Sequence, residues 1–261
     1  MSRFDVGTAH PARRYNYWLG GKDNFAADRQ SGDAIAATFP GIRDSVRENR
    51  RFLRRTVEFL AREAGIDQFL DIGTGLPTAD NTHEVAQRIT PHARIVYVDN
   101  DPIVLAHARA LLTSSPRGAT AYIDADLREP SKILEAPQLR ATLDLRRPVA
   151  LVLLAVLHFV HDDRDPYGVV RRVLDALPAG SYLVMSHATY DLVPPDKVAT
   201  LEAQSGGQWR SRSRAEFARF FDGLELIEPG VVPIGDWRPE PGTERPDPAQ
   251  IVTYGAAGRR P

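Results

Sequence analysis

Apolar positions along the chain follow two patterns, short continuous runs and helical spacing. The runs predict buried strands, and apolar residues recurring every three or four positions predict amphipathic helices. Strands are expected at residues 68–72, 94–99, 119–124, 148–157, 181–187, 224–227 and 251–254. Helices are expected at residues 45–64, 78–89, 102–112, 165–177, 195–204 and 213–221. This alternation predicts an α/β fold, a mostly parallel sheet with helices on both faces.

The N-terminal part of the chain departs from this alternation. Several aromatic residues surround the Gly20–Gly21 pair, and no strand pattern precedes residue 45. We therefore expect residues 1–44 to form an appendage and residues 45–261 to form the α/β domain. Residues 236–248 are rich in proline, glycine and charge, which is typical of a surface loop.

The strongest chemical signal is a glycine-rich turn after the first predicted strand. Gly73, Thr74 and Gly75 follow Asp71, and glycine at such a turn lets the backbone approach a ligand closely. Asp99 ends the second predicted strand, where a carboxylate can accept hydrogen bonds from both hydroxyls of a ribose. Asn100 follows it directly. Together these residues predict a site for an adenosine-containing cofactor.

Two features of the turn favour S-adenosylmethionine over a dinucleotide. The third glycine of a dinucleotide fingerprint is replaced by Thr78, which follows Pro77. The carboxylate of Asp71 would repel a pyrophosphate but attract the ammonium group of a methionine moiety. An NAD-dependent oxidoreductase is the less favoured alternative.

Further candidate cofactor contacts follow the third predicted strand. Asp126 could accept a hydrogen bond from the adenine amino group, and Leu127 could pack on the adenine ring. The alternative is structural, because aspartate is also a favoured residue at the start of a helix.

Histidines near the ends of two strands are candidates for catalysis. His158 directly follows the fourth predicted strand, where it could act as a general base or a positioning group. A buried, hydrogen-bonded structural histidine is the alternative. His187 and Tyr190 could line a pocket for the acceptor. His161 lies beside two aspartates, but no third ligand is spaced to match, so we expect no metal site.

Composition and charge limit the partners and the compartment. The net charge is −1, so no global positive field favours nucleic acid, and a nucleic-acid partner is not expected. The chain has no cysteine, no apolar N-terminal leader and no apolar stretch of about 20 residues. These features predict a cytoplasmic protein without a membrane partner.

Five segments resemble a known family. They are residues 14–28 (RYNYWLGGKDNFAAD), 69–78 (FLDIGTGLPT), 96–102 (VYVDNDP), 154–158 (LAVLH) and 180–187 (GSYLVMSH). In these segments the chain resembles the S-adenosyl methyltransferase family of high-GC Gram-positive bacteria, long catalogued as a domain of unknown function. The resemblance implies a Rossmann-like class I methyltransferase fold with S-adenosylmethionine at Gly73, Gly75 and Asp99.

The resemblance also implies that the N-terminal segment folds as a helical lid over the cofactor. Residues that would then help to close the site are Tyr17, Gly20, Gly21, Lys22 and Asn24. Alternatively, the glycine pair only ends a helix and the aromatic residues anchor the segment.

The expected function is therefore methyl transfer from S-adenosylmethionine to an unidentified small-molecule acceptor, with S-adenosylhomocysteine as product. The alternative is a regulatory module that binds either form of the cofactor without turnover. The oligomeric state does not follow from the sequence.

Overall fold

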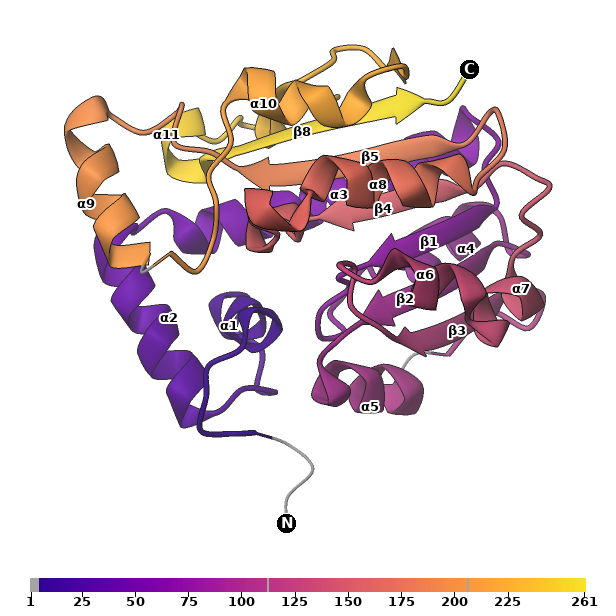
Figure 1. Ribbon diagram of the computed structural model, residues 1–261, viewed down its shortest axis with the longest axis horizontal. Coiled ribbons are helices and arrows are strands. Elements are labelled where there is room, and N and C mark those ends of the chain that lie inside the picture. The colour runs from indigo at the N-terminus through magenta and orange to yellow at the C-terminus, as the bar shows by residue number, and fades with distance from the viewer. Residues whose placement is uncertain (1–4, 112, 206) are drawn as a thin grey trace.

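A single mixed sheet organises the described part of the chain, residues 5–111, 113–205 and 207–261 of a computed structural model (Figure 1). Its strands are β1 (Gln68–Ile72), β2 (Arg94–Asp99), β3 (Ala119–Asp124), β4 (Ala150–Leu154), β5 (Tyr182–Ala188), β6 (Glu225–Leu226), β7 (Val232–Pro233) and β8 (Thr253–Arg259). The spatial order is β3-β2-β1-β4-β5-β8-β6, and β7 also pairs with β8. Strands β1 to β5 are parallel, whereas β8 runs antiparallel to β5 and to β6.

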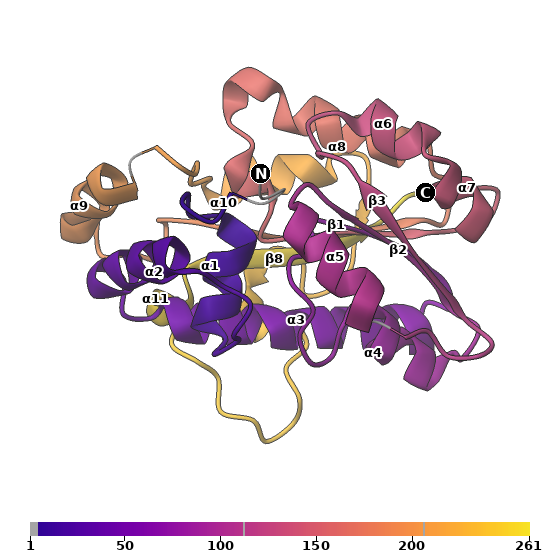
Figure 2. The same ribbon diagram turned by 90° about the horizontal axis from the view of Figure 1, so that it is seen from below.

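Helices cover both faces of the sheet, which confirms the predicted α/β fold (Figure 2). One face carries α3 (Ile42–Arg62) and α4 (Thr82–Ile89). The other face carries α6 (Pro130–Glu135), α7 (Pro137–Thr142), α8 (Pro166–Asp175) and α10 (Arg214–Ala218). The remaining helices are α1 (Pro11–Trp18), α2 (Ala26–Thr38), α5 (Pro102–Leu111), α9 (Pro195–Ser205) and α11 (Pro248–Ile251). Four short 3₁₀ helices are η1 (Leu157–Phe159), η2 (Asp162–Arg164), η3 (Arg219–Phe221) and η4 (Ile234–Asp236).

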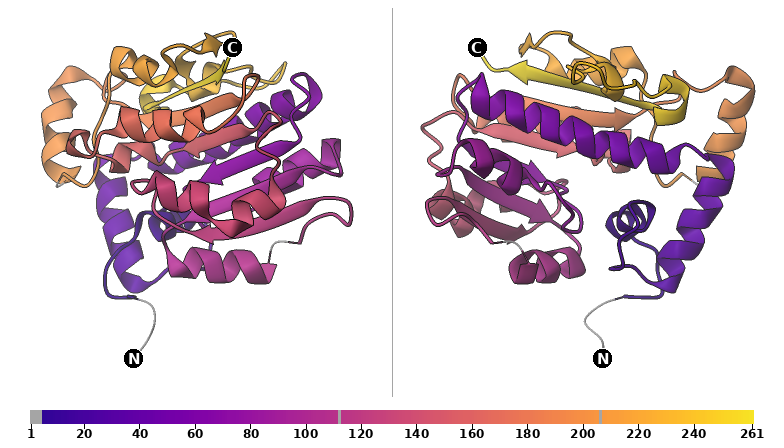
Figure 3. Two further views of the ribbon diagram at one scale, coloured as in Figure 1. Left: turned by 45° about the vertical axis from the view of Figure 1, so that its right-hand side comes forward. Right: turned by 180° about the vertical axis from the view of Figure 1, so that it is seen from behind.

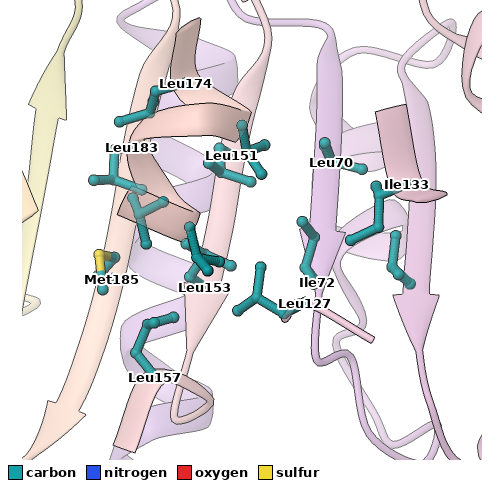
Figure 4. Packing of buried hydrophobic residues seen from close by; sticks show 14 of the residues in the cluster. Leu70, Ile72, Leu127, Ile133, Leu151, Leu153, Leu157, Leu174, Leu183 and Met185 are labelled. Atoms are coloured by element: carbon teal, nitrogen blue, oxygen red, sulfur yellow. The ribbon is translucent and has the colours of Figure 1, made fainter. Parts of the chain in front are cut away.

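The central strands are buried on both faces, so successive side chains pack alternately into two hydrophobic cores, one on each face of the sheet. Leu70 and Ile72 of β1 face α6 and α8, together with Leu151 and Leu153 of β4 (Figure 4). Phe69 points the other way, toward α3. Continuous apolar runs are expected of parallel strands covered on both sides. The long helix α3 crosses the back of the sheet (Figure 3).

Two predicted elements end or begin elsewhere because of local backbone chemistry. The helix expected from residue 78 begins at Thr82, where Asn81 and Glu84 form a capping box that satisfies the first free N–H groups. The strand expected at 148–157 is shorter, because Ala155 adopts a left-handed φ of 54° and cannot continue the ladder.

The C-terminal strand and two helices also differ from the expectation. The strand predicted at 251–254 contains the end of α11, and β8 continues to Arg259. Helices α6 and α7 were not predicted, since each has only 6 residues and too short an apolar pattern. Of the helix predicted at 102–112, residue 112 lies outside the described residues, as do residues 1–4 of the N-terminal segment.

The strand order places a crevice at the carboxyl ends of the central strands. On one side of β1 the chain continues to β2 and β3, and on the other to β4 and β5. Open α/β sheets bind ligands at such a reversal, outside the carboxyl ends of the strands. Helices α1, α2 and α9 lie beyond these ends (Figure 1). Among the described helices, none has the length and apolar character needed to cross a membrane.

Candidate active site

A cavity of about 860 Å³ occupies the crevice between the strand ends and the N-terminal helices. Its wall includes most of the residues that the sequence singles out. They are Asp71, Gly73, Thr74, Gly75, Asp99, Asn100, Asp126, Leu127, His158 and Tyr190. The ends of β1 to β5 and the loops after them therefore bring together side chains that are far apart in the sequence.

The glycine-rich turn is held in a conformation that other residues adopt rarely. Gly73 and Gly75 have φ values of 76° and 69°. The N–H of Gly73 donates to the carbonyl of Val98, 2.8 Å away, which ties the turn to β2. A Cβ on Gly73 would lie only 2.6 Å from Cγ2 of Val156. The turn therefore needs glycine at this position for both backbone and packing reasons.

Asp99 presents a buried carboxylate beside this turn. Its Oδ2 accepts from the N–H of Gly75 at 2.8 Å, and its Oδ1 accepts from the N–H of Asp101 at 2.9 Å. Burial raises the pKa of Asp99 to about 6, although these backbone hydrogen bonds oppose the shift. Each oxygen keeps a second lone pair, so the carboxylate can still accept from two ligand hydroxyls.

Asp71 is the second buried carboxylate of the wall. Its Oδ2 accepts a 2.6 Å hydrogen bond from the hydroxyl of Thr82. Burial raises the pKa of Asp71 to about 6, while the Thr82 hydroxyl and the positive charge of Arg50 act in the opposite direction. A cationic ligand group near Asp71 would favour its ionised form.

The carboxylate of Asp126 accepts hydrogen bonds from two neighbouring side chains. Arg128 donates to it through Nε and Nη2, and Asn100 donates through Nδ2 at 2.8 Å. The Arg128 side chain is the main reason that the pKa of Asp126 falls to about 2. A ligand amino group would have to share this carboxylate with Arg128.

His158 lies in the wall as a neutral imidazole. Burial lowers the pKa of His158 to about 3, and the positive charges of Arg212 and Arg14 add to the shift. Its Nδ1 has no hydrogen-bond partner among the described residues. The ring contacts Phe159 and Trp209, at centroid distances of 4.3 Å and 6.1 Å. A histidine with this pKa is a weak base, so the geometry favours a positioning role over proton abstraction.

A titration of His158 checks this electrostatic description. We expect the imidazole to stay neutral from pH 8 to below pH 4, because its pKa of about 3 lies far under the ordinary 6.5. Nitrogen-15 chemical shifts of the ring, assigned with His158→Gln, report the charge directly. A titration midpoint near 6.5 would contradict the buried environment described here.

The other two candidate histidines, His161 and His187, lie outside the cavity wall. His187 is fully buried, and its Nε2 accepts from Nη1 of Arg212 at 2.9 Å, since arginine can only donate. The Nδ1 then carries the proton and donates to the carbonyl of Ala188. Arg212 also binds Asp162, the neighbour of His161. Among the described residues no cluster of three or more His, Asp or Glu is placed to hold a metal.

The residues of α1 that line the cavity differ from those predicted from the sequence. Arg14, Tyr15 and Trp18 of α1 line the wall, as do several residues of α2. None of the predicted lid residues Tyr17, Gly20, Gly21 or Lys22 is in the wall, and neither is Asn24.

Local contacts explain why those residues point elsewhere. The Tyr17 hydroxyl donates to Asp33 of α2. Gly20 has a φ of 82° just after α1, and Lys22 is exposed. Asn24 donates to the carbonyl of Gly21 and so braces the turn. The glycine pair thus lies in the turn directly after α1.

A buried ionic cluster joins this segment to the loop after β2. Asp28 accepts from the N–H of His10 at 2.8 Å and from that of Phe25 at 2.9 Å. Arg13 lies 3.6 Å from Asp28 and 3.3 Å from Asp101, which is two residues beyond Asp99. The N-terminal segment is therefore fixed to the loop that directly follows Asp99. The domain boundary predicted at 44/45 falls inside α3.

Known proteins settle the family. The whole chain, residues 1–261, matches the model of a family described as S-adenosyl methyltransferase. The chain belongs to the S-adenosyl methyltransferase family. This match confirms the resemblance seen in the sequence and S-adenosylmethionine as the cofactor. No curated protein matches the chain.

Solved structures agree with this assignment. A DUF574-family protein from Streptomyces avermitilis is 48% identical, with a TM-score of 0.93 over 99% of this chain and 100% of that one. A candidate methyltransferase from Thermobifida fusca is 42% identical, with a TM-score of 0.89 over 98% and 96% of the two chains. The N-methyltransferase NodS from Bradyrhizobium japonicum, solved with S-adenosyl-L-homocysteine, is 17% identical over 83% and 88%, with a TM-score of 0.51, and shows a likeness of fold alone.

The cavity of this S-adenosyl methyltransferase suits its cofactor better than a dinucleotide. A dinucleotide places its pyrophosphate on a helix that starts at the glycine-rich turn. Here α4 begins only at Thr82, seven residues after Gly75, so the glycine-rich turn does not continue directly into a helix. The cavity wall beside the turn instead contains the buried carboxylate of Asp71, which would repel a pyrophosphate.

The sequence reasoning missed part of the wall that comes from α1 and α3. Tyr15 donates its hydroxyl to the carbonyl of Val46 and accepts from Asn49, and Asn49 accepts in turn from Ser186 of β5. Polar residues at Ser45 and Asn49, on the face of the helix that carries its apolar positions, were the available signal. This network fixes α1 against the sheet.

Proposed function

We propose that the cavity holds S-adenosylmethionine along the ends of β1, β2 and β3, and that a small-molecule acceptor binds on the side of α1 and α2. The observation that carries the proposal is a cavity of about 860 Å³ that extends from Asp99 to the N-terminal helices. Pockets for small organic ligands range from about 300 to 1,000 Å³. Residues of α1, α2 and α9 line this cavity together with the strand ends, a concave setting that favours a small-molecule acceptor.

The proposed roles follow from the geometry of the wall. Asp99 accepts the ribose hydroxyls, Asp71 holds the ammonium group, and the Gly73–Gly75 turn lets the backbone approach the methionine moiety. Leu127 contacts the adenine, next to Asn100 and Asp126. Thr74, whose hydroxyl donates to the carbonyl of Asp71, stabilises the turn.

When bound, S-adenosylmethionine supplies a methyl group on a positively charged sulfur, which a lone pair of the acceptor takes by in-line displacement while the carbon–sulfur electron pair stays on sulfur. Positioning in a closed site provides much of the rate in such a transfer. His158 contributes as a positioning residue, because its neutral imidazole lies in the cavity wall and is too weak a base to take the proton of the acceptor. The helices α1 and α2 exclude water from the site.

We further propose that residues 1–44 act as the cover of the domain formed by residues 45–261, and that the protein works in the cytoplasm. The ionic cluster of Arg13, Asp28 and Asp101 supports the first statement, since it holds the cover against the sheet. The complete lack of cysteine is in keeping with the second.

Affinity for the cofactor should depend on pH through the two buried acids. Burial raises the pKa of Asp71 and of Asp99 to about 6, and the ligand's ammonium and hydroxyl groups favour the ionised forms. We expect the affinity for S-adenosylhomocysteine to fall by about 10- to 100-fold from pH 7.5 to pH 5, and Asp71→Asn to make the slope shallower. Calorimetric titrations across this range measure it, and a pH-independent affinity would count against both roles.

The effect on the stability of the ligand-free protein has the opposite sign. The folded-state pKa of about 6 exceeds the ordinary 3.8. The folded state therefore binds more protons than the unfolded state between these values. The contribution of these two acids to stability is complete below pH 3.8 and is lost as pH rises through 6.

Transfer of a labelled methyl group tests the proposed function. The purified protein is incubated with methyl-tritiated S-adenosylmethionine and with separate small-molecule, protein and nucleic-acid fractions of a Streptomyces avermitilis extract. We expect label in the small-molecule fraction and none with Asp99→Asn. Label in a macromolecular fraction would contradict the acceptor class. Tight cofactor binding with no transfer to any fraction would indicate the regulatory module instead.

A further inference from the structure

Arg14 is a buried cation in the wall of the cavity. Its side chain comes from α1, and the residue is only 5% exposed. Its Nη1 donates to the hydroxyl of Ser31 at 3.0 Å and to Oε1 of Gln208 at 2.7 Å. Both partners are neutral, and no Asp or Glu of the described residues lies within ion-pair distance of Arg14. A buried charge without a counterion is costly unless a ligand supplies one.

One edge of the Arg14 guanidinium has no partner. The buried Nε makes no hydrogen bond, and Nη2 on the same edge makes none in the described part of the chain. In two other arginines of the protein, the same Nε–Nη2 edge binds a carboxylate. Arg128 donates through Nε and Nη2 to the two oxygens of Asp126, and Arg146 does so to Asp144 at 2.9 Å and 3.0 Å. The free edge of Arg14 is therefore a fork of the geometry that fits a carboxylate.

The acidic residues near Arg14 already have other hydrogen-bond partners or a proposed role in cofactor binding. Asp28 acts on Arg14 electrostatically, but its two oxygens accept backbone N–H groups of His10 and Phe25. The acids of the wall itself, Asp71, Asp99 and Asp126, belong to the cofactor side. Nothing in the described protein therefore completes the fork.

The surroundings of Arg14 also define the rest of the ligand. Trp209 follows its partner Gln208 and lies 4.9 Å from the ring of Tyr190, measured between centroids. The wall around them is mostly apolar, with contributions from Ile35, Phe159 and Val193. Such a lining takes a flat apolar body and leaves the orientation to a few polar groups.

Resting on the proposed function, we propose that Arg14 binds a carboxylate carried by the methyl acceptor, so that the substrates are small apolar molecules with one carboxylate group. The cofactor carries a carboxylate too, on its methionine moiety. The experiment must therefore separate these two sources.

The test compares Arg14→Met with the wild type in two titrations. The first uses S-adenosylhomocysteine beside 5′-methylthioadenosine, which lacks the amino-acid part. The second, at saturating S-adenosylhomocysteine, uses benzoate, 2-naphthoate and indole-3-acetate, each beside its neutral amide. Arg47→Met is the matched control, because Arg47 is exposed on α3, outside the wall, in a surface pair with Asp44.

We expect the wild type to bind at least one of these carboxylates better than its amide. Arg14→Met should weaken that carboxylate by about 10- to 100-fold, as for the loss of a charged hydrogen-bonded pair, and leave the amide and S-adenosylhomocysteine unchanged. Arg14→Lys should recover only part of the affinity, because ammonium offers no fork. Arg47→Met should change nothing.

Three results would overturn the assignment. One is a wild type that binds no carboxylate better than its amide. Another is Arg14→Met weakening S-adenosylhomocysteine but not 5′-methylthioadenosine, which would assign the carboxylate to the cofactor. The third is a lowered melting temperature of the ligand-free Arg14→Met protein with unchanged carboxylate binding, which would make Arg14 structural. Failure of S-adenosylhomocysteine to bind the wild type would instead reject the proposed function.

Discussion

Asp99→Asn is expected to weaken the affinity for S-adenosylhomocysteine by about 100- to 10,000-fold while the protein stays folded. The carboxylate already accepts from the N–H groups of Gly75 and Asp101, and the ribose hydroxyls need its two remaining lone pairs. An amide has one oxygen, and its NH₂ cannot accept. The variant therefore loses two charged hydrogen bonds, each worth about 1.5 to 3 kcal/mol.

Asp124→Asn is the matched control for this substitution. Asp124 ends β3 directly beside Asp99 in the register of the sheet, but it is exposed and lies outside the cavity wall. Calorimetric titration should give wild-type affinity for this control, and thermal melting should show both variants folded. If Asp99→Asn binds within about threefold of the wild type, Asp99 is not the ribose acceptor.

Gly73→Ala should abolish cofactor binding and lower the free energy of unfolding by about 2 to 5 kcal/mol. A left-handed backbone costs a residue with a Cβ about 1 to 2 kcal/mol, and crowding adds about 1 to 3. The new Cβ would meet Val156 at 2.6 Å and 2.8 Å, from Cγ2 and Cβ. Neither atom can swing away freely, because Val156 is β-branched and lies just after β4, at the start of η1. Relief of the clash must therefore move the turn.

Gly65→Ala separates the backbone effect from the packing effect. Gly65 also has a φ of 69°, but a Cβ added there would meet nothing within 4 Å, and the residue lies outside the cavity wall. Denaturant unfolding should show a loss of about 1 to 2 kcal/mol for this control, with unchanged affinity for S-adenosylhomocysteine. Equal losses for the two alanine variants would mean that the contact with Val156 has no energetic weight.

The grouping of Asp71, Gly75 and Asp99 in one cavity could be predicted because it depends on local order along the chain. A glycine turn after one strand and an acid at the end of the next come together wherever the two strands pair in parallel, as β1 and β2 do here. Asp71, Gly75 and Asp99 accordingly line one cavity. The family resemblance added the cover but not its geometry.

The cover could not be read from the sequence, because packing decides which face of α1 turns inward. Tyr17 and Arg14 are equally able to line a pocket, yet Asp33 draws the Tyr17 hydroxyl toward α2. Arg14 meets Gln208, 194 positions later, and the sequence offers no sign of that encounter. The end of β4 was missed for a similar reason, since an alanine rarely takes the left-handed φ found at Ala155.

A crystal structure of the protein with S-adenosylhomocysteine tests the central claim most directly. The adenosyl ligand should occupy the cavity, with both ribose hydroxyls within about 3.2 Å of the Asp99 carboxylate and the amino-acid part over the Gly73–Gly75 turn. A ligand bound elsewhere, or a ribose that does not contact Asp99, would contradict the site described here.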